Sequence, residues 1–341
     1  MNGKKANVTL GDLAKALGVS SGTVSRALSN HPKISEATKN RVKEVALSMG
    51  YVYSIQASIQ QNFSHKTIGI LVPSFTQNKY TQMIESARNA FESNGYQVIV
   101  CSSSESAKKE QETMLLFENL NVQGALIALT SQVKNPEYLN HFVKKKPTVL
   151  FHRVSFDMPC KKVMIDHFQA GYRAVQHLLN NGYNKIAHLG GNLNCPLTKQ
   201  VATGYKTAIR NGGFVANPAL EVFSDFLFED VMKASEIIFS QNERPDAILI
   251  DDVRAAQKLI SILQTRKIRI PEDVAIIALG DELDYSYYSP SITTIQFPYS
   301  KVGEKAARLL LEQLQNKTGT TSNDISVEPF QLSIRNSTLR N

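Results

Sequence analysis

Three short helical patterns, crowded into residues 9–50, constrain this chain more than any other feature of its sequence. The first begins at Thr9, a residue type that favours the N-cap of a helix, and ends at Gly18, which favours the C-cap. Ser20 is placed to cap the second pattern, and Ser35 the third. Because apolar residues recur at helical spacing in all three, the sequence predicts amphipathic helices packed around a small core.

Helices of this length and spacing are typical of the helix-turn-helix plan. In that plan the second helix lies in the major groove of DNA, and the residues at its N-terminal end reach base edges. We therefore expect Ser21, Gly22 and Arg26 to read bases, with Arg26 foremost because a guanidinium can donate two hydrogen bonds to guanine. Short polar side chains near helix ends are expected to position the unit on DNA, mainly through phosphates: Thr9, Ser20, Thr23, Ser25 and Asn30.

The charge distribution bears on an alternative interpretation, in which Arg26 is a solvated surface charge and the hydroxyl groups only cap helices. Residues 1–66 carry nine Lys or Arg against three acidic residues, a net charge of +6 out of +8 for the whole chain. The remaining residues therefore carry only +2. A small basic head on a nearly neutral body indicates contact with a polyanion, so the distribution favours DNA binding.

The composition of the chain limits which class of protein it can belong to. It has 341 residues, of which 42% are hydrophobic, which suits two or three domains with cores of their own. No apolar run reaches the roughly 18–20 residues that a membrane helix needs, and the polar start lacks the apolar stretch of a secretion signal. Cys101, Cys160 and Cys195 form neither an even set nor a CxxC spacing. We expect a cytoplasmic protein with no membrane segment, no metal site and no cofactor.

Beyond residue 67, apolar strand-like runs alternate with helical stretches, for example in TIGILVP, YQVIVCS, KIAHLG and VAIIAL. Such alternation is typical of parallel α/β sheets, and the number of crossovers suits two lobes better than one. Ligands bind at the C-terminal ends of the strands in such sheets, here between the lobes. Each loop residue there is by itself more often an ordinary polar residue or cap, so the expectation rests on their convergence. The candidates are Ser74, Phe75, Asn78, Tyr80, His152, Arg153, Asn192, Lys199, Gln200, Asp251, Asp252, Asp281, Glu282 and Gln296.

The run VTLGDLAKALGVSSGTVSRAL, followed by ISEATKNRV and MGY, resembles the LacI/GalR family of bacterial transcription regulators. The likeness continues through the body, in pairs such as Ile165-Asp166 and Gly204-Tyr205 and in the run IPEDV, and so covers nearly the whole chain. The resemblance implies a lactose-repressor-like, sequence-specific DNA-binding regulator, expected to be a repressor. It also implies an all-α helix-turn-helix head and an α/β, periplasmic-binding-protein-like body of two lobes with parallel sheets.

The resemblance further implies how the chain is divided and controlled. A homodimer would read a pseudopalindromic operator in double-stranded DNA. A small molecule between the lobes, namely a sugar, a sugar phosphate or a sugar acid, would raise or lower operator affinity. The implied parts are a DNA-binding domain at 7–52, a hinge or linker at 53–66, and an effector-binding and dimerisation domain at 67–341, with a first lobe at about 67–163 and 296–324 and a second at about 164–293 and 325–341.

The linker departs from the family pattern. The family implies a hinge helix that orders on DNA and pushes a leucine into the minor groove. Here Tyr53 stands where proline is usual, and Gln60 stands at the leucine position. Ile59 could act as the wedge and Gln60 could hydrogen-bond the groove floor, whereas a plain polar linker is the alternative. We hypothesise that this hinge bends DNA less than is usual in the family.

The effector contacts that the family implies are also altered. The positions concerned are Val201 for a usual arginine, His152 for an aspartate, Gly280 for an acid and Asp251 for an asparagine, while Asp281 is retained. Recognition of a typical sugar by paired polar groups is therefore expected to be impaired. We hypothesise that Lys199 restores a positive charge and binds a phosphate or carboxylate. Phe75, Asn78, Tyr80 and Gln296 complete the expected effector contacts.

Two other classes of protein share such a body. An α/β enzyme is disfavoured because the chain has no GxSxG, HExxH, GxxxxGK[ST] or GxGxxG motif. The adjacent Asp251 and Asp252 suit a helix cap better than a metal pair, because neighbouring side chains at a strand end point apart. A secreted solute receptor is disfavoured by the polar N-terminus and by the helix-turn-helix pattern.

Overall fold

The computed structural model of the chain describes residues 8–29, 31–49, 51, 66–131, 137–241, 244–281, 287–316 and 323–339. Asn30, Ile59 and Gln60 lie outside these residues, as does the linker up to residue 65, and so does the side chain of Asp281. The contacts expected of these four residues, and the weaker bend of DNA, therefore stay predictions.

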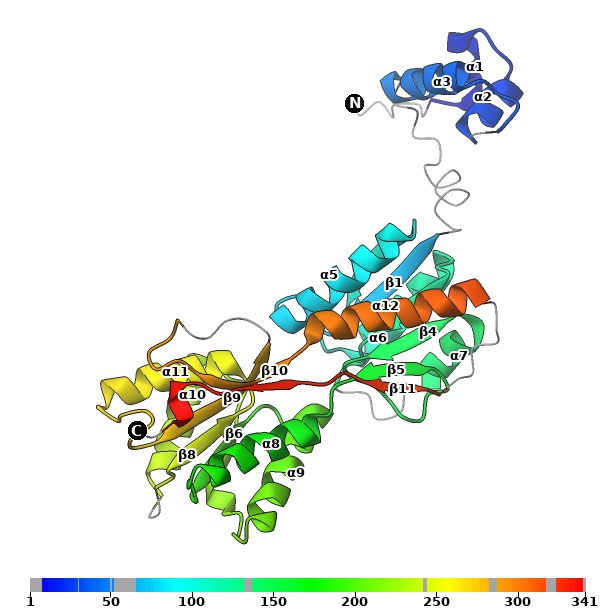
Figure 1. Ribbon diagram of the computed structural model, residues 1–341. Helices are drawn as coiled ribbons and strands as arrows, with labels where there is room; N and C mark the ends of the chain where they lie inside the picture. The colour runs from blue at the N-terminus through cyan, green and yellow to red at the C-terminus, as the bar shows by residue number, and fades with distance from the viewer. Residues whose placement is uncertain are drawn as a thin grey trace.

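The head is a unit of three helices, and each begins where its sequence predicts (Figure 1). The hydroxyl groups of Thr9, Ser20 and Ser35 each accept a hydrogen bond from the backbone N–H three residues later. These caps satisfy N–H groups that have no partner within a helix, which is why the short helices have sharp starts. The helices are α1 (Leu10–Leu17), α2 (Ser21–Leu28) and α3 (Glu36–Ser48).

The core of the head is small and apolar. Leu13, Val24, Ala27 and Val42, which come from all three helices, are at most 1% exposed. Gly18 ends α1 with a positive φ of 67°, a conformation that glycine adopts without a steric penalty. That sharp end lets α2 begin at once and turn its apolar face onto α1.

The first lobe is built on a sheet in the order β11-β5-β4-β3-β1-β2, in which every described pairing is parallel. All residues of β1, β3 and β4 are buried, as expected of a parallel sheet covered on both faces. Its elements are β1 (Thr67–Val72), α5 (Asn78–Ser93), β2 (Gln97–Ser102), α6 (Ala107–Asn119), β3 (Gly124–Ile127), α7 (Glu137–Lys145), β4 (Thr148–Phe151), β5 (Lys161–Met164), α12 (Tyr299–Asn316) and β11 (Ile325–Val327).

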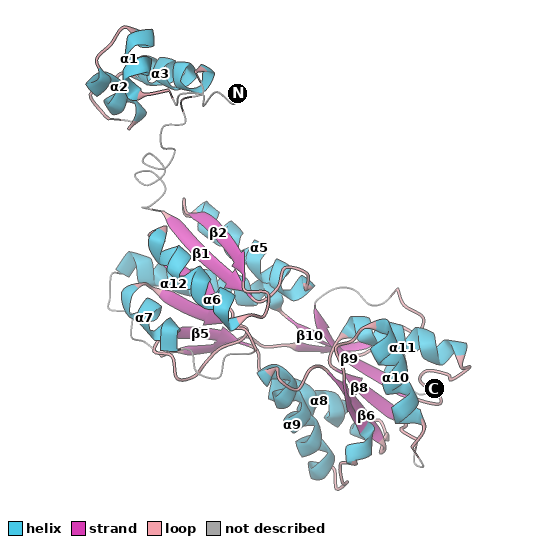
Figure 2. Ribbon diagram, turned by 180° about the vertical axis from the view of Figure 1, so that it is seen from behind, coloured by secondary structure: helices cyan, strands magenta, loops and turns pink. Residues whose placement is uncertain are grey.

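The second lobe repeats this plan with the order β12-β10-β9-β8-β6-β7, and only β12 runs antiparallel to its described neighbour. Figure 2 labels the central strands β6, β8, β9 and β10 of this sheet. The predicted fold class, a helical head followed by two parallel α/β lobes, is thus confirmed. The elements are α8 (His167–Asn180), β6 (Ile186–Gly190), α9 (Pro196–Asn211), β7 (Glu221–Phe223), α10 (Phe228–Phe239), β8 (Ala247–Ile250), α11 (Val253–Thr265), β9 (Ala275–Asp281), β10 (Thr293–Phe297) and β12 (Gln331–Ser333), with 3-10 turns at Pro218–Leu220 and Asn336–Thr338.

The chain passes to the second lobe after β5, returns between β10 and α12, and passes over again between β11 and β12. The last two passages lie a few residues later than the predicted boundaries. Pairing with β9 keeps β10 in the second sheet as far as Phe297, whereas the prediction ended that lobe at residue 293. Pairing with β5 places Ile325–Val327 in the first sheet, whereas the prediction assigned them to the second lobe.

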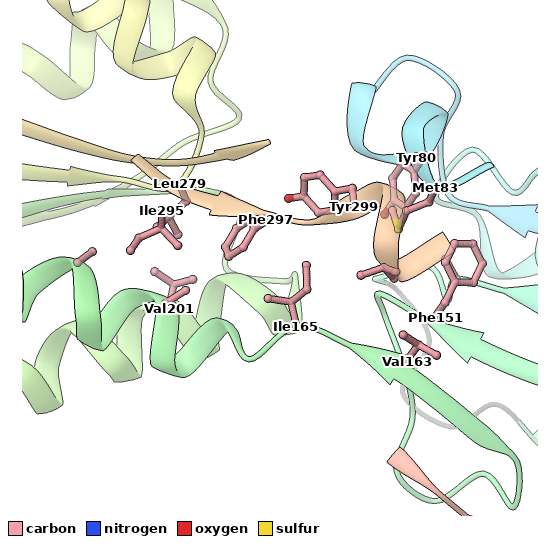
Figure 3. Close-up of a cluster of buried hydrophobic side chains, with 14 of the residues drawn as sticks. Tyr80, Met83, Phe151, Val163, Ile165, Val201, Leu279, Ile295, Phe297 and Tyr299 are labelled. Atoms are coloured by element: carbon pink, nitrogen blue, oxygen red, sulfur yellow. The ribbon is translucent and has the colours of Figure 1, made fainter. Parts of the chain in front are cut away.

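Apolar side chains of both lobes form one continuous cluster where the chain crosses (Figure 3). Phe297 and Tyr299 lie on the segment that joins β10 to α12, with Val201 on one side and Tyr80 on the other. The rings of Phe297 and Tyr299 meet edge to face, 5.7 Å between centroids. Because burial of apolar surface stabilises contacts, this cluster holds the two lobes in their described arrangement.

The close packing of α8 on α9 depends on Gly204. A Cβ at this position would lie 2.1 Å from the carbonyl oxygen of Phe168, a backbone atom that cannot move without shifting α8. We expect Gly204→Ala to lower the free energy of unfolding by about 1–3 kcal/mol, as other overpacking substitutions do. Urea denaturation of the full chain measures this effect. Thr203→Ala, on the exposed side of α9, is the control, and equal stability of the two variants would contradict the prediction.

Candidate nucleic-acid interface and interlobe site

The outer face of α2 carries the residues that the sequence singled out. Ser21, Gly22, Ser25 and Arg26 are exposed, whereas Val24 on the other face is fully buried. The Ser20 hydroxyl group lies 2.9 Å from that of Thr23 and accepts a hydrogen bond from the Thr23 N–H. Two hydroxyl groups and free N–H groups therefore meet at the positive end of the helix, an arrangement that suits a phosphate.

Arg26 is held along the axis of α2. Its Nε donates a hydrogen bond of 3.1 Å to the carbonyl oxygen of Gly22, one turn earlier. The guanidinium therefore lies over the first turn of the helix and keeps its two Nη groups for other partners. Within the described ranges, no carboxylate lies within ion-pair distance of Arg26. A planar donor fixed in this way matches the acceptor pair of guanine.

Gly22 makes room for this arginine. A Cβ at position 22 would lie 3.3 Å from Nη2 of Arg26, so the guanidinium would have to shift. We expect Gly22→Ala to stabilise the head by about 0.5–1 kcal/mol, because alanine favours helices over glycine, and at the same time to weaken operator binding severalfold. Thermal denaturation and a gel shift measure the two effects. Changes of the same sign in stability and affinity would contradict the proposed role of Gly22.

Thr9 has a second function that qualifies its predicted phosphate contact. Its backbone N–H and its hydroxyl group both donate to the Asp12 carboxylate, at 2.8 and 2.7 Å. These two hydrogen bonds hold the pKa of Asp12 below its usual value. The hydroxyl proton of Thr9 is thus used within α1, and its contact with DNA stays a prediction.

His152 follows β4 directly and lies at the centre of the interlobe contact. Its backbone has a positive φ of 60°, and its side chain is 1% exposed. Its ring meets those of Tyr80 and Tyr299 edge to face, with both pairs of centroids 5.6 Å apart. Neither ring nitrogen has a hydrogen-bond partner among the described residues, and neither has the hydroxyl group of Tyr80. Buried polar atoms without partners are costly, so these atoms mark a place where another molecule can supply them.

His167, at the start of α8 in the second lobe, lies beside His152. Its ring lies 5.7 Å from that of His152 and 4.9 Å from that of Phe297. Its Nδ1 lies 2.9 Å from the carbonyl oxygen of Ile165, which can only accept, so Nδ1 carries the proton of the neutral ring. We call Tyr80, His152, His167, Phe297 and Tyr299 the interlobe junction.

Arg153, the next residue after His152, is anchored by a carboxylate. Its Nη1 lies 2.6 Å from Oε1 of Glu105, and its side chain is almost completely buried. The other oxygen of Glu105 accepts hydrogen bonds from Thr130 and Ser131. Against the effect of burial, these contacts hold the pKa of Glu105 below its usual value. The Nε of Arg153 has no partner in the described part of the chain.

Lys79 is a second cation beside the junction. Its ammonium lies 5.5 Å from the centroid of the Tyr80 ring, and no carboxylate of the described residues lies within ion-pair distance of it. Burial, and then the like charge of Arg153, lower the pKa of Lys79 to about 8. The first lobe thus presents two neighbouring cations to the junction and anchors only one of them with an acid.

Both carboxylate oxygens of Asp251, in the second lobe, have hydrogen-bond partners within that lobe. One carboxylate oxygen lies 2.8 Å from Nε2 of the buried His188, and the other accepts a hydrogen bond from the N–H of Gly191. The neighbouring Asp252 caps α11 by accepting from two backbone N–H groups, as the sequence predicts. Asp251 therefore holds the second lobe together before it meets any ligand.

The structure brings together only part of the predicted effector set. Tyr80 and His152 are adjacent, whereas Phe75 and Asn78 are exposed at the start of α5, and Lys199 is exposed in the first turn of α9. Gln296 accepts a hydrogen bond from Ser333, which joins β10 to β12.

Val201 is the predicted contact that the structure places least favourably. Its side chain is 2% exposed and belongs to the core, where its backbone packs against Gly171 of α8. It offers an incoming molecule no polar group. An effector contact by Val201 would need a rearrangement of the packing between α8 and α9.

The sequence does not predict Lys79, Glu105 or His167 as site residues. A weak signal was available for two of them, because Lys79 stands between two predicted contacts and His167 follows Asp166 at a strand end. Glu105 lies on a loop after β2, and nothing in the sequence indicates that it meets Arg153. In the ranges that the structure describes, no cluster of His, Cys, Asp or Glu is arranged to hold a metal ion, and no helix is both long and apolar enough to span a membrane.

Two family models match the chain. Residues 9–54 match the model described as bacterial regulatory proteins, lacI family, and residues 175–338 match that of a periplasmic binding protein-like domain. The first match covers the three helices of the head, and the second covers most of the second lobe with α12 and the C-terminal strands.

Curated relatives and solved structures align over almost the whole chain. The HTH-type transcriptional repressor PurR of Vibrio atlanticus is 26% identical over 309 residues, which is 91% of this chain and 92% of that protein. The repressor CytR of Escherichia coli is 29% identical over 311 residues, 91% and 90% of the two chains. A structure of the lac repressor dimer bound to operator and an anti-inducer aligns with a TM-score of 0.77 at 20% identity, covering 98% of this chain and 100% of that one. The cellobiose complex of the regulator CelR aligns with a TM-score of 0.70 at 22% identity, covering 97% and 100%.

Proposed function

The chain belongs to the lacI family of bacterial regulatory proteins and is a DNA-binding transcriptional regulator, and from this premise we propose that a sugar or sugar derivative bound at the interlobe junction controls its affinity for an operator. Its relatives are transcriptional repressors, not enzymes, and we propose repression here as well. The observation that carries the proposal is the set of buried polar atoms without partners on Tyr80, His152 and Arg153.

The head supports operator binding through α2. We propose that Arg26 reads a guanine and that Ser21 contacts a neighbouring base, because both are exposed on the face opposite the core. Ser20, Thr23 and Ser25 are the proposed phosphate contacts. The glycine at position 22 lets the backbone approach the base edges closely and keeps Arg26 in place.

Two exposed apolar faces support the homodimer. On and just after α6 of the first lobe, Leu115, Leu116 and Leu120 are 55%, 43% and 41% exposed. On α10 of the second lobe, Phe228 and Met232, one helical turn apart, are 52% and 37% exposed. Each lobe therefore has a face that a second copy would bury, and contact through both lobes would make the spacing of the two heads depend on the angle between the lobes.

The junction supplies the coupling. Its residues come from α5, the end of β4, the start of α8 and the segment between β10 and α12, so any molecule that contacts His152 and His167 touches both lobes. A ligand with different affinity for two lobe angles shifts their populations, by a coupling free energy of roughly 1–3 kcal/mol in typical cases. The spacing of the two heads changes with the angle between the lobes, and the affinity for the operator changes with that spacing. Because its operator is chromosomal DNA, we place the protein in the cytoplasm.

The experiment begins with an operator selected from random DNA by the full chain. A gel shift with that operator is then repeated in the presence of candidate sugars, sugar phosphates and sugar acids. We expect a pseudopalindromic operator and an effector that changes its Kd by about five- to 150-fold. A selected site without twofold symmetry would contradict the dimer. An effector that acts equally on a Tyr80→Phe, His152→Leu double variant would contradict the site.

A further inference from the structure

Two cations of the first lobe approach the interlobe junction, and only one of them forms an ion pair with an acid of the described residues. Lys79 and Arg153 both approach it from the first lobe, and Glu105 pairs with Arg153 alone. The Lys79 ammonium contacts the face of the Tyr80 ring, a favourable but weak partner compared with a carboxylate. Burial penalises a cation without a counter-ion, which is why the pKa of Lys79 falls to about 8.

The donors around these cations are fixed. Glu105 is itself held by Thr130 and Ser131, so the guanidinium of Arg153 keeps one orientation with its Nε free of any described partner. The ring of Tyr80, whose hydroxyl group also has no described partner, lies under the Lys79 ammonium. An ammonium, a guanidinium N–H and a phenol O–H are all donors to a negative oxygen.

Acceptors for a neutral sugar are scarce at the same place. Both oxygens of Asp251 are used by His188 and Gly191, and Asp252 is used by the first turn of α11. His152 stands at the position where the family commonly has an aspartate, and its neutral ring offers one acceptor nitrogen in place of two carboxylate oxygens. Hydroxyl groups of a sugar need acceptors for their protons, whereas an anion needs the donors that this junction has.

We infer that the effector carries an anionic group, the phosphate of a sugar phosphate or the carboxylate of a sugar acid, which Lys79, Arg153 and Tyr80 bind together while Glu105 keeps Arg153 in place. The inference rests on the proposed interlobe effector site and narrows its ligand. It replaces Lys199, which is exposed on α9, by Lys79 as the second positive charge. Since Arg153 and Tyr80 are buried in the described arrangement and Lys79 is partly buried, the ligand reaches all three donors when the lobes part.

Titration calorimetry and thermal shift of the full chain test the inference with named probes. The probes are glucose 6-phosphate, fructose 6-phosphate, gluconate and inorganic phosphate as anions, with glucose and fructose as neutral counterparts. We expect at least one anion to bind about tenfold or more tightly than its neutral counterpart. We expect Lys79→Gln and Arg153→Gln each to weaken that binding about ten- to 100-fold, since each removes a charge-assisted hydrogen bond.

Lys199→Gln is the matched control and should leave the affinity unchanged. Lys79→Gln removes a partly buried charge that has no described ion-pair partner. The melting temperature of this variant without ligand should therefore equal or exceed that of the unaltered chain, so that lost affinity cannot be ascribed to misfolding. Binding of neutral sugars as tight as that of anions would overturn the inference, as would absence of binding by every anion. So would equal losses in the Lys79 and Lys199 variants. The gel shift tests the proposed function separately from these binding measurements. If only operator binding failed, the proposed function would be refuted and the inference about the anion would not.

Discussion

Replacement of Arg26 by alanine is expected to abolish most of the sequence-specific affinity of this protein for its operator. Each subunit of a dimer loses a pair of hydrogen bonds to guanine, which is worth roughly 1–3 kcal/mol, so the dimer loses roughly 2–6 kcal/mol over two half-sites. The fold should not change, because the side chain is exposed and, among the described residues, hydrogen-bonds only to the Gly22 carbonyl oxygen one turn earlier. A gel shift against the selected operator and against random DNA measures both affinities.

Arg41→Ala provides the control for charge. Arg41 is an exposed cation on α3, so its loss removes the same charge from the head without removing a proposed base contact. We expect it to weaken binding to operator and random DNA by similar, small factors. Arg26→Ala should instead weaken operator binding much more than random binding. Equal losses for the two DNAs in the Arg26 variant would show that this arginine contacts phosphate and does not read a base.

The helices of the head could be predicted from the sequence because their starts are local. A hydroxyl group at Ser20 or Ser35 and an N–H three residues later are sufficient to begin a helix, whatever lies around it. The apolar strands β1, β6 and β9 were equally clear, since continuous apolar runs suit a parallel sheet covered on both faces.

The short edge strands could not be predicted in this way. β11 and β12 have three residues each and no continuous apolar run, and their places depend on partners far along the chain. Ile325 pairs beside Lys162, and Leu332 beside Ile295. Such pairings are set by the assembled lobes, and for this reason the predicted lobe boundaries missed the last two crossings by a few residues.

At the interlobe site too, residues could be predicted where the signal is local and could not where it depends on the assembled lobes. His152 was recognisable as an unusual residue at a strand end, but its burial among aromatic rings depends on α5, α8 and the segment before α12 together. The sequence predicts Asp251 as an effector contact, whereas in the structure the ring of His188, which lies 63 positions earlier, is 2.8 Å from its carboxylate. Lys79 stands out because no carboxylate of the described residues lies within ion-pair distance of it, a property of the assembled structure that no local pattern expresses.

The two junction histidines make the contact between the lobes sensitive to pH. Burial, and then the nearby charge of Lys79, hold the pKa of His152 well below its usual value. The pKa of His167 is lowered to about 4. Burial is the main cause, the charge of Lys79 acts in the same direction, and the hydrogen bond to Ile165 acts against them. Around the two rings stand Lys79 and Tyr80 from α5, Arg153, Tyr299 from α12, and Asp166 and Asp251 from the second lobe. Both rings are therefore neutral at neutral pH in the packed junction.

We expect the free energy of unfolding to fall on acidification by roughly 1.4 kcal/mol per pH unit for each of these histidines. In the unfolded chain both rings bind protons below their ordinary pKa of about 6.5, whereas in the packed junction they do not. Their full contribution is thus present above pH ~6.5 and is lost as the pH falls from there toward about 4, the folded pKa of His167. Carboxylates with lowered pKa, such as Glu105, lose their contribution only nearer pH 4, so the range from 6.5 to 5 reports mainly on histidine.

Urea denaturation of the full chain at pH 7.5, 6.5, 5.5 and 5.0 measures the slope, and a His152→Asn, His167→Asn double variant should remove most of it. Asparagine keeps a side-chain N–H for the Ile165 carbonyl oxygen and does not titrate. His141→Asn, on the exposed side of α7, is the control and should keep the slope. His177 is also buried, with a lowered pKa, and leaves a smaller slope in every variant. If the double variant kept the full slope, protonation would be acting elsewhere in the chain, and the junction would not be the part of the molecule that senses pH.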